Sequence, residues 1–238
     1  MTITSPHNEK LKEIRKLGRQ RRQRTQLQRF VAEGEDLLAA ADQAGWRAAE
    51  RYCATGSGLP GIEVDAKLLH SVSSLGSGTR TLAVYEERWQ PVPVGPLCVY
   101  LHGVADPGNV GAVLRSAQAF GASCVALGPG SADPYGPKAV RASMGAVFGV
   151  PLARAAALDE LPGTKIALVA REGAALYELP PEDLLQATLL IGAEREGLPE
   201  SLVAVADHVA HIPIATHSLN AAMAATIALY EVTRMARG

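Results

Sequence analysis

Aromatic residues are scarce in this 238-residue chain: Phe, Trp and Tyr make up 5% of it, against 47% for all hydrophobic residues. We therefore expect a core built mainly from Ala, Val and Leu. No apolar run approaches the roughly 20 residues of a transmembrane helix, and the first ten residues lack the apolar stretch of a signal peptide. These absences predict a cytoplasmic protein that does not contact a membrane.

Cysteine is also sparse, because only Cys53, Cys98 and Cys124 occur and they lie far apart. An odd number without a C-x-x-C pair argues against a disulfide framework and against zinc-binding spacing. Near the C-terminus, His208, His211 and His217 cluster, but no acid or cysteine completes a metal-ligand set with them. We therefore predict no metal site.

Several common motifs of nucleotide-binding and hydrolytic enzymes are missing. The chain has no G-x-G-x-x-G after a strand, no Walker motif and no G-x-S-x-G elbow. The segment Gly128-Pro129-Gly130 interrupts the chain as a loop and does not have the form of a phosphate cradle. These observations argue against dinucleotide-binding, P-loop and α/β-hydrolase chemistry.

Positive charge is concentrated near the N-terminus, although the net charge is only −1. Residues 9–29 carry nine basic and two acidic side chains, a balance of +7, which leaves −8 for the remainder. We predict a helix over residues 8–29, with one basic stripe formed by Lys12, Arg15, Lys16, Arg19 and Arg22. The stripe is either a solvated helix face or a strip that binds nucleic-acid phosphates.

The first 89 residues alternate between helical and extended patterns and predict a small α/β domain. After the basic helix we expect a short apolar element at 30–34 that runs into a turn, strands at 51–54 and 81–85, helices at 35–44 and 65–70, and a Ser/Gly loop at 71–78. Three prolines and a glycine then mark residues 90–96 as a semi-rigid linker. The predicted domains are therefore 1–89 and 97–238, with the linker between them.

The region after the linker predicts an α/β fold with a parallel sheet and crossover helices. Its apolar runs indicate strands at 97–101, 123–127, 150–153, 165–170, 188–191 and 208–212. Its amphipathic or alanine-rich stretches indicate helices at 109–120, 138–147, 199–206 and 219–236.

Three segments follow the expected strand ends, where ligands bind in open α/β sheets. The first, D-P-G-N-V-G-A-V-L-R-S-A, starts at Asp106, and we expect Asn109 to cap its helix. The second, G-A-E-R-E-G-L, spans 192–198. The third, I-P-I-A-T-H-S-L-N-A-A-M-A-A, spans 212–225, and Ser218 is its expected helix cap. The alanine-rich helix that follows predicts close packing, either in the core or against another subunit.

In this order and spacing, the three segments closely resemble the motifs of the SpoU/TrmH branch of the SPOUT RNA methyltransferases. Residues 138–146 resemble the middle segment of that family, and the first 89 residues resemble its small RNA-binding domain more loosely. The resemblance implies a parallel sheet with helices on both faces and a C-terminal trefoil knot. It also implies a homodimer that uses S-adenosylmethionine (SAM) to methylate a ribose 2′-hydroxyl of rRNA or tRNA.

The resemblance also assigns roles to individual residues. The SAM-binding positions of the family correspond to Ile191, Gly192, Ile212, Pro213 and Leu219. Its catalytic positions correspond to Arg115, Asn109, Glu194, Ser218 and Asn220. Because arginine keeps its proton at ordinary pH, Arg115 either acts as an unusual base or stabilises the developing alkoxide. The alternatives are a non-catalytic RNA-binding protein of the same fold and an unrelated α/β enzyme acting on a small molecule.

Overall fold

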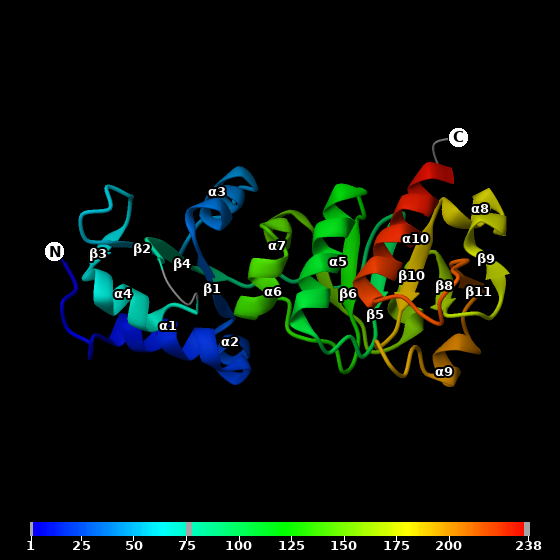
Figure 1. Cartoon of the computed structure of the whole chain (residues 1–238), viewed down its shortest axis with the longest axis horizontal. Coiled ribbons are helices and arrows are strands. Elements are labelled where there is room, and N and C mark those ends of the chain that lie inside the picture. The colour runs from blue at the N-terminus through cyan, green and yellow to red at the C-terminus, as the bar shows by residue number, and fades with distance from the viewer. Residues whose placement is uncertain (1, 75–77, 236–238) are drawn as a thin grey trace.

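The computed structural model of the protein describes residues 2–74 and 78–235. Figure 1 shows two regions side by side, each with its own sheet. The N-terminal region contains a four-stranded sheet in the order β1-β4-β2-β3. Its strands are β1 (Arg29–Glu33), β2 (Glu50–Ala54), β3 (Ile62–Val64) and β4 (Thr81–Glu86). Its helices are α1 (Glu9–Arg19), α2 (Arg21–Leu27), α3 (Glu35–Gln43) and α4 (Ala66–Val72).

The C-terminal region contains a seven-stranded sheet in which every neighbouring pair is parallel. In spatial order its strands are β7 (Leu152–Arg154), β6 (Cys124–Leu127), β5 (Leu97–Leu101), β10 (Ala187–Ile191), β8 (Thr164–Val169), β11 (His208–His211) and β9 (Ala174–Ala175). The helices and 3₁₀ turns are α5 (Pro107–Ala119), α6 (Pro137–Ala142), α7 (Ala146–Gly149), η1 (Leu158–Glu160), η2 (Leu176–Glu178), α8 (Pro181–Leu184), α9 (Glu200–Val203) and α10 (Ala221–Met235).

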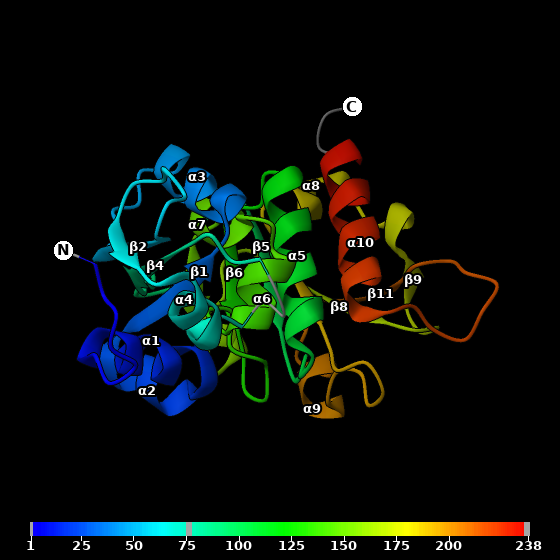
Figure 2. The same ribbon diagram turned by 60° about the vertical axis from the view of Figure 1, so that its left-hand side comes forward.

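Helical elements cover both faces of this sheet, because alternate strand residues point to opposite faces. On one face, Leu97, Val99 and Leu101 of β5 share a buried cluster with residues of α5 and α10. On the other, Cys98 and Tyr100 pack with residues from η1 and α9. Figure 2 shows α5 and α10 lying side by side, and the hydroxyls of Ser116 and Thr226 are 2.6 Å apart across that contact. The predicted fold class is confirmed, while the trefoil knot stays a prediction.

The scarce aromatic residues gather where the two regions meet. Of the 11 aromatic side chains, Phe30, Trp46 and Tyr85 come from the N-terminal region and contact Tyr135 and Phe148 of the C-terminal region, with ring centroids 4.6–5.9 Å apart. The Trp46 indole donates a hydrogen bond to the Phe148 carbonyl at 2.8 Å. One buried cluster therefore spans the two regions, while a second cluster around Leu11, Ile14 and Leu17 belongs to the N-terminal region alone.

Two predicted helices are wrong because each is two helices in the structure. The helix expected over residues 8–29 breaks at Gln20, whose backbone is extended, so α1 and α2 run separately. The break lets Arg24 of α2 turn inward and pair with Asp133 at 2.8 Å. The helix expected over 138–147 breaks between α6 and α7, where Met144 and Gly145 adopt positive φ angles of 49° and 96°.

The other predicted elements of both regions are present, with ends that shift by a few residues. The strand expected at 150–153 is the shorter β7, and β3, β9, η1, η2 and α8 were not predicted. The loop expected at 71–78 and the helix expected at 219–236 include residues 75–77 and 236, which lie outside the described residues. None of the helices in the described part of the chain has both the length and the apolar character of a membrane span.

Candidate functional site

Helix α5 begins one turn earlier than the sequence suggested. Asp106, not Asn109, is the N-cap, and its Oδ1 accepts hydrogen bonds from the backbone N–H groups of Gly108 and Asn109. Pro107 occupies the first helical position, where its missing N–H costs nothing and its fixed φ suits a helix. The predicted capping role of Asn109 is therefore wrong, and its side chain is free for other contacts.

Helix α10 also begins at a different residue from the expected one. Asn220 Oδ1 accepts from the backbone N–H groups of Ala222 (2.9 Å) and Met223 (3.3 Å), which satisfies the first turn. Ser218 lies two residues before this cap, and the predicted capping role of Ser218 is wrong. The serine hydroxyl is instead exposed at the edge of a cavity.

Side chains from the three segments form one hydrogen-bonded chain. Asn220 Nδ2 donates to Asn109 Oδ1 at 3.0 Å, and Asn109 Nδ2 donates to Glu194 Oε1 at 2.6 Å. The residues are separated by 111 and 85 positions in sequence, so only the fold brings them together. Three of the five predicted catalytic residues thus meet at the starts of α5 and α10.

The backbone fixes the direction of this chain. The helix start takes the oxygen of Asn220, so its amide nitrogen must face Asn109. Asn109 must then present its own oxygen to Asn220 and its nitrogen to the Glu194 carboxylate. The side-chain amides of Asn220 and Asn109 therefore each donate one hydrogen bond and accept at least one. The second carboxylate oxygen of Glu194 can accept a hydrogen bond from another donor.

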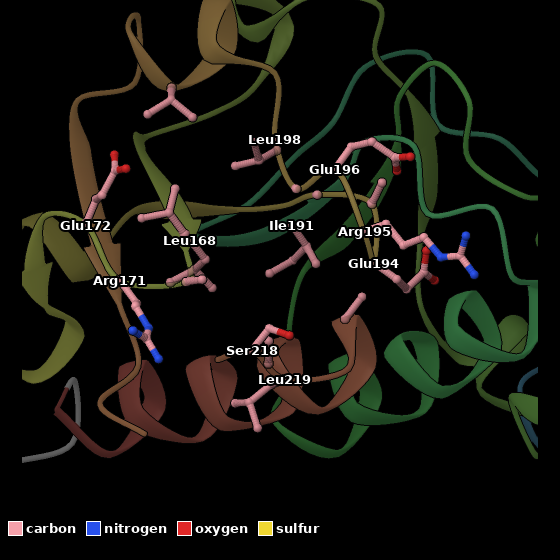
Figure 3. Close-up of a pocket in the computed structure, with 18 of the residues that line it drawn as sticks. Leu168, Arg171, Glu172, Ile191, Glu194, Arg195, Glu196, Leu198, Ser218 and Leu219 are labelled. Carbon is pink, nitrogen blue, oxygen red and sulfur yellow. The ribbon is translucent and has the colours of Figure 1, made fainter. Parts of the chain in front are cut away.

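A cavity of about 660 Å³ lies beside this chain, at the carboxyl ends of β8, β10 and β11. This volume is within the range of cofactor sites. In Figure 3, Leu168, Ile191 and Leu198 face Ser218 and Leu219, which lie above the start of α10. The walls are largely apolar, and the loop at 194–196 adds charged groups at the rim.

Most of the predicted SAM-binding residues line this cavity. Ile191, Gly192, Ile212 and Leu219 belong to its wall, whereas Pro213 does not. Gly192 is required by the backbone of its own loop. A Cβ atom at Gly192 would lie 2.2 Å from the carbonyl carbon of Gly197 and 2.3 Å from the nitrogen of Leu198. Gly192 therefore permits the tight loop that forms one side of the cavity.

One wall of the cavity was not predicted from the sequence. It is the segment 168–172 at the end of β8. The Arg171 guanidinium in this segment lies 3.0 Å from His217 Nδ1 and 3.5 Å from the Thr216 carbonyl oxygen. It therefore connects the end of β8 to the loop that precedes α10. Because segment 168–172 follows a parallel strand, its position was consistent with a ligand-binding role. Its residues, however, show no pattern that distinguishes it from the ends of the other strands.

Arg115 stands apart from the other predicted catalytic residues. Its side chain is exposed on α5 and does not line the cavity. Among the described residues, no acidic oxygen lies within ion-pair distance of it. Within one chain, therefore, the structure does not bring Arg115 to Asn109 or Glu194.

An ion pair supports the start of α5. Lys138 Nζ of α6 donates to Asp106 Oδ2 at 2.8 Å. This hydrogen bond, with the backbone N–H groups that the carboxylate caps, lowers the pKa of Asp106 below its usual value. Lys138, the first residue of the segment 138–146, thereby stabilises the start of α5, the helix that carries Asn109.

The predicted RNA-binding side chains are divided between two helices. Lys12 pairs with Glu9 at 2.7 Å, Arg15 is half-buried, and Lys16 and Arg19 are exposed on α1. Arg22 is exposed on α2, so the stripe is not continuous along one helix. Within the ranges 2–74 and 78–235, no group of three or more His, Cys, Asp or Glu side chains is arranged to hold a metal ion.

Comparison with known proteins identifies relatives of this arrangement. A 23S rRNA (uridine(2479)-2′-O)-methyltransferase of Streptomyces viridochromogenes is 37% identical over 60% of this chain, which spans 54% of that relative. A 23S rRNA (guanosine(2553)-2′-O)-methyltransferase of Bacillus subtilis is 28% identical over 97% of this chain and 98% of the relative. The crystal structure of an AdoMet-bound rRNA methyltransferase from Sinorhizobium meliloti matches with a TM-score of 0.87 and 30% identity, over 98% of this chain and 97% of that one.

The sequence profile of the SpoU rRNA Methylase family matches residues 96–230. This range contains all three segments, the cavity and the hydrogen-bonded chain of Asn220, Asn109 and Glu194. The resemblance inferred from the motifs is confirmed. The chain belongs to the SpoU rRNA methylase family.

Proposed function

We propose that this protein transfers a methyl group from SAM to a ribose 2′-hydroxyl of RNA. The observation that carries the proposal is the cavity at the meeting point of the three family segments, with Asn109, Glu194 and Asn220 in one chain beside it. Its volume suits a nucleoside-sized cofactor, and its apolar walls suit an adenine ring. Ile191, Gly192, Ile212 and Leu219 would hold SAM, with Pro213 in the adjoining loop.

When bound, SAM supplies an electrophilic methyl group on a positively charged sulfur. The chain then has to orient the ribose hydroxyl, remove its proton and stabilise negative charge on its oxygen. Glu194 is the best-placed proton acceptor, because Asn109 occupies one of its carboxylate oxygens and leaves the other available. Ser218, exposed at the cavity edge, can donate a hydrogen bond to the substrate.

A homodimer is part of this proposal. Three large side chains on α10 are exposed: Met223 by 59%, Ile227 by 38% and Tyr230 by 54%. A group of exposed apolar side chains on one helix is typical of an interface with another protein chain. Arg115 lies on α5 beside α10, next to Ser116 at the contact between the two helices. A second copy packed on this face would place its own Arg115 at the interface, where it can stabilise the developing alkoxide or bind the adjacent phosphate.

The RNA partner is proposed from the family and from the exposed basic side chains of α1 and α2. Lys16, Arg19 and Arg22 are available for phosphates, with Lys12 and Arg15 at the margin of the surface. The names of the relatives favour rRNA over tRNA as the substrate class. Such a substrate places the enzyme in the cytoplasm.

Transfer of tritium from methyl-labelled SAM to total rRNA or tRNA tests the activity. We expect label in RNA and its recovery as a 2′-O-methyl nucleotide after digestion. Absence of label on every RNA, with SAM binding intact, would refute the enzyme proposal and favour a non-catalytic RNA-binding protein.

The variant Arg115→Ala tests the proposed role of Arg115. We expect kcat to fall by about 10²- to 10³-fold, as when a charge-stabilising group is removed, with RNA and SAM affinity retained. The matched control is Arg234→Ala, because Arg234 is an exposed arginine on α10 that pairs locally with Glu231. An unchanged kcat in Arg115→Ala would remove Arg115 from the catalytic set.

A further inference from the structure

A second cavity lies where the N-terminal region meets the large sheet. It has a volume of about 320 Å³, and its walls come from Arg21 of α2, Trp89, the loop 127–134 and Arg154 with the residues after it. None of these residues belongs to the predicted SAM-binding or catalytic set. The cavity, here called the junction cavity, is therefore separate from the one beside Asn109.

Trp89 and Arg154 form a stacked pair in this wall. The Arg154 guanidinium lies over the Trp89 ring at 4.2 Å from its centroid. Two further contacts hold the indole, because its Nε1 donates to Glu87 Oε2 at 2.7 Å and its ring meets Tyr135 edge-on at 5.3 Å. Arg154 is exposed, so the plane of its guanidinium that faces away from Trp89 is accessible to a ligand. A planar cation fixed on an aromatic ring is a stacking platform for a nucleobase.

The charge of the junction cavity favours an anion. Its one acidic side chain, Asp133, is neutralised by Arg24, which lies 2.8 Å away and is almost fully buried. Arg21 and Arg154 are exposed, and no acidic oxygen within the described residues lies within 4 Å of either. Arg21 also borders a shallow hollow with Arg22, so the positive surface continues along α2.

The junction cavity opens at the same edge of the sheet as the cofactor cavity. The strands β6 and β7 lead into it and β10 leads into the other, and all of them are parallel. Because β10 is two positions from β6 and three from β7, the facing walls of the two cavities are roughly 10–15 Å apart at about 4.8 Å per strand, and the cofactor cavity extends further across β8 and β11. The wall loop also bonds directly to the approach to α5: Gly103 N donates to Pro129 O, and Ala132 N donates to Val104 O, both at 2.9 Å.

We propose that the junction cavity binds a single-stranded nucleotide of the RNA substrate, close in sequence to the nucleotide that is methylated. The base stacks on the Arg154 guanidinium, and a flanking phosphate pairs with Arg21. This inference rests on the proposed function, since it names a further contact for the same substrate. It gives the enzyme a second point of attachment that fixes the direction of the RNA strand across the sheet edge.

Steady-state methylation with total rRNA from cells that lack the enzyme, together with binding of a short oligouridylate, tests this proposal. We expect Arg154→Ala to raise KM for RNA and Kd for the oligonucleotide by about 5- to 150-fold, the range that corresponds to loss of one stacked base. The kcat and the Kd for SAM should stay unchanged. Arg154→Lys should not restore affinity, because lysine keeps the charge but not the planar stacking surface.

Arg21→Ala should weaken RNA binding less and should reduce the slope of log Kd against log salt by about one. Arg47→Ala is the matched control, because Arg47 is an exposed arginine of the N-terminal region outside both cavities. Unchanged KM in Arg154→Ala, full rescue by Arg154→Lys, or an equal effect of Arg47→Ala would overturn the stacking site. Failure of the wild-type enzyme to methylate RNA refutes the proposed function, whereas a silent Arg154→Ala in an active enzyme refutes only this inference.

Discussion

Two cavities open at one edge of the large sheet, and their charges are opposite. The cofactor cavity has four carboxylates, from Glu172, Glu194, Glu196 and Glu200, against two guanidinium groups at its rim. In the junction cavity, the carboxylate of Asp133 is cancelled by Arg24, which leaves exposed guanidinium groups. A positively charged sulfonium cofactor and a polyanionic RNA would therefore each meet a surface of opposite charge, at strand ends two or three positions apart in the same sheet. The opposite charges of the two cavities would attract the cofactor to one and the RNA to the other, before the shape of either cavity contributes to recognition.

A large effect is expected from disrupting the cofactor cavity alone. In Gly192→Ala the new Cβ would meet backbone atoms of Gly197 and Leu198, which cannot move without displacing the loop that forms the cavity wall. We expect the Kd for SAM to rise by more than about tenfold and the free energy of unfolding to fall by about 1–3 kcal/mol. Calorimetric titration with SAM and denaturant unfolding measure these changes.

The matched control is Gly18→Ala. Gly18 lies within α1, and a Cβ atom there meets nothing within 4 Å. This substitution should raise the free energy of unfolding by about 0.5–1 kcal/mol and leave SAM binding unchanged. If Gly192→Ala binds SAM as tightly as the wild type, the loop does not shape the cofactor site.

A smaller effect should follow from replacing the Asn220 amide, which is part of the hydrogen-bonded chain, by a carboxylate. Asn220→Asp keeps an oxygen for the start of α10 but replaces the nitrogen that donates to Asn109 Oδ1. Since Asp and Asn cap helices about equally well, stability should stay near that of the wild type. We expect methylation to fall about tenfold, because Asn109 can no longer be held with its nitrogen toward Glu194.

Asn220→Ala separates capping from orientation. It removes both functions of the side chain, so methylation should fall and the free energy of unfolding should also drop by about 1 kcal/mol. Thermal unfolding and initial rates, measured on both variants, distinguish the two effects. Full activity in Asn220→Asp would show that the chain from Asn220 to Glu194 has no role in the reaction.

The smallest expected effect concerns the ion pair between Lys138 and Asp106. Lys138 follows the wall loop of the junction cavity and lowers the pKa of Asp106, the cap of the helix that carries Asn109. A carboxylate with a lowered folded-state pKa stabilises the protein above its unfolded pKa and loses this contribution as pH falls through the folded value. Lys138→Met should therefore lower the stability of the protein above the usual pKa of a carboxyl group, and the difference from the wild type should disappear as pH falls through the folded-state pKa of Asp106.

Thermal unfolding from neutral pH to below about pH 5 measures this difference. The two midpoints should differ by a constant amount from neutral pH down to about pH 5 and converge at lower pH, once Asp106 is protonated in both proteins. Because Asp106 is exposed, solvent screens the pair and the shift should be small. A constant difference between the two proteins at every pH would instead indicate that Lys138 acts through packing.

The strands of the large sheet could be predicted from the sequence because their burial leaves a direct record in apolar runs such as Leu97–Leu101. Helix starts were less certain, since Asp106, Asn109, Ser218 and Asn220 are all good capping residues. The position of Pro107 was the available signal for the true start of α5. For α10 the decision depended on the neighbouring α5, whose Asn109 accepts a hydrogen bond from the same side chain that caps the helix.

Charge was the property that sequence reasoning interpreted least well. The predicted basic stripe required one continuous helix over residues 8–29. The helix instead breaks, and Arg24 points into the interior, where it pairs with Asp133, 109 positions later in the sequence. The aromatic residues showed a similar limit. Their small number was evident, but not their concentration between the two regions, because contacts such as the one between Trp46 and Phe148 join residues with no local pattern in common.

The sequence alone determined the family, the parallel α/β architecture and the three segments that form the site, because each leaves a local pattern of burial, turns and spacing. Only the tertiary structure decided that Asn220, Asn109 and Glu194 form one directed chain, that Arg115 lies outside the cavity of its own chain, and that Trp89 and Arg154 stack in the wall of a second cavity. These features depend on distances between residues remote in sequence, and such distances are set by how the strands are ordered and the helices packed.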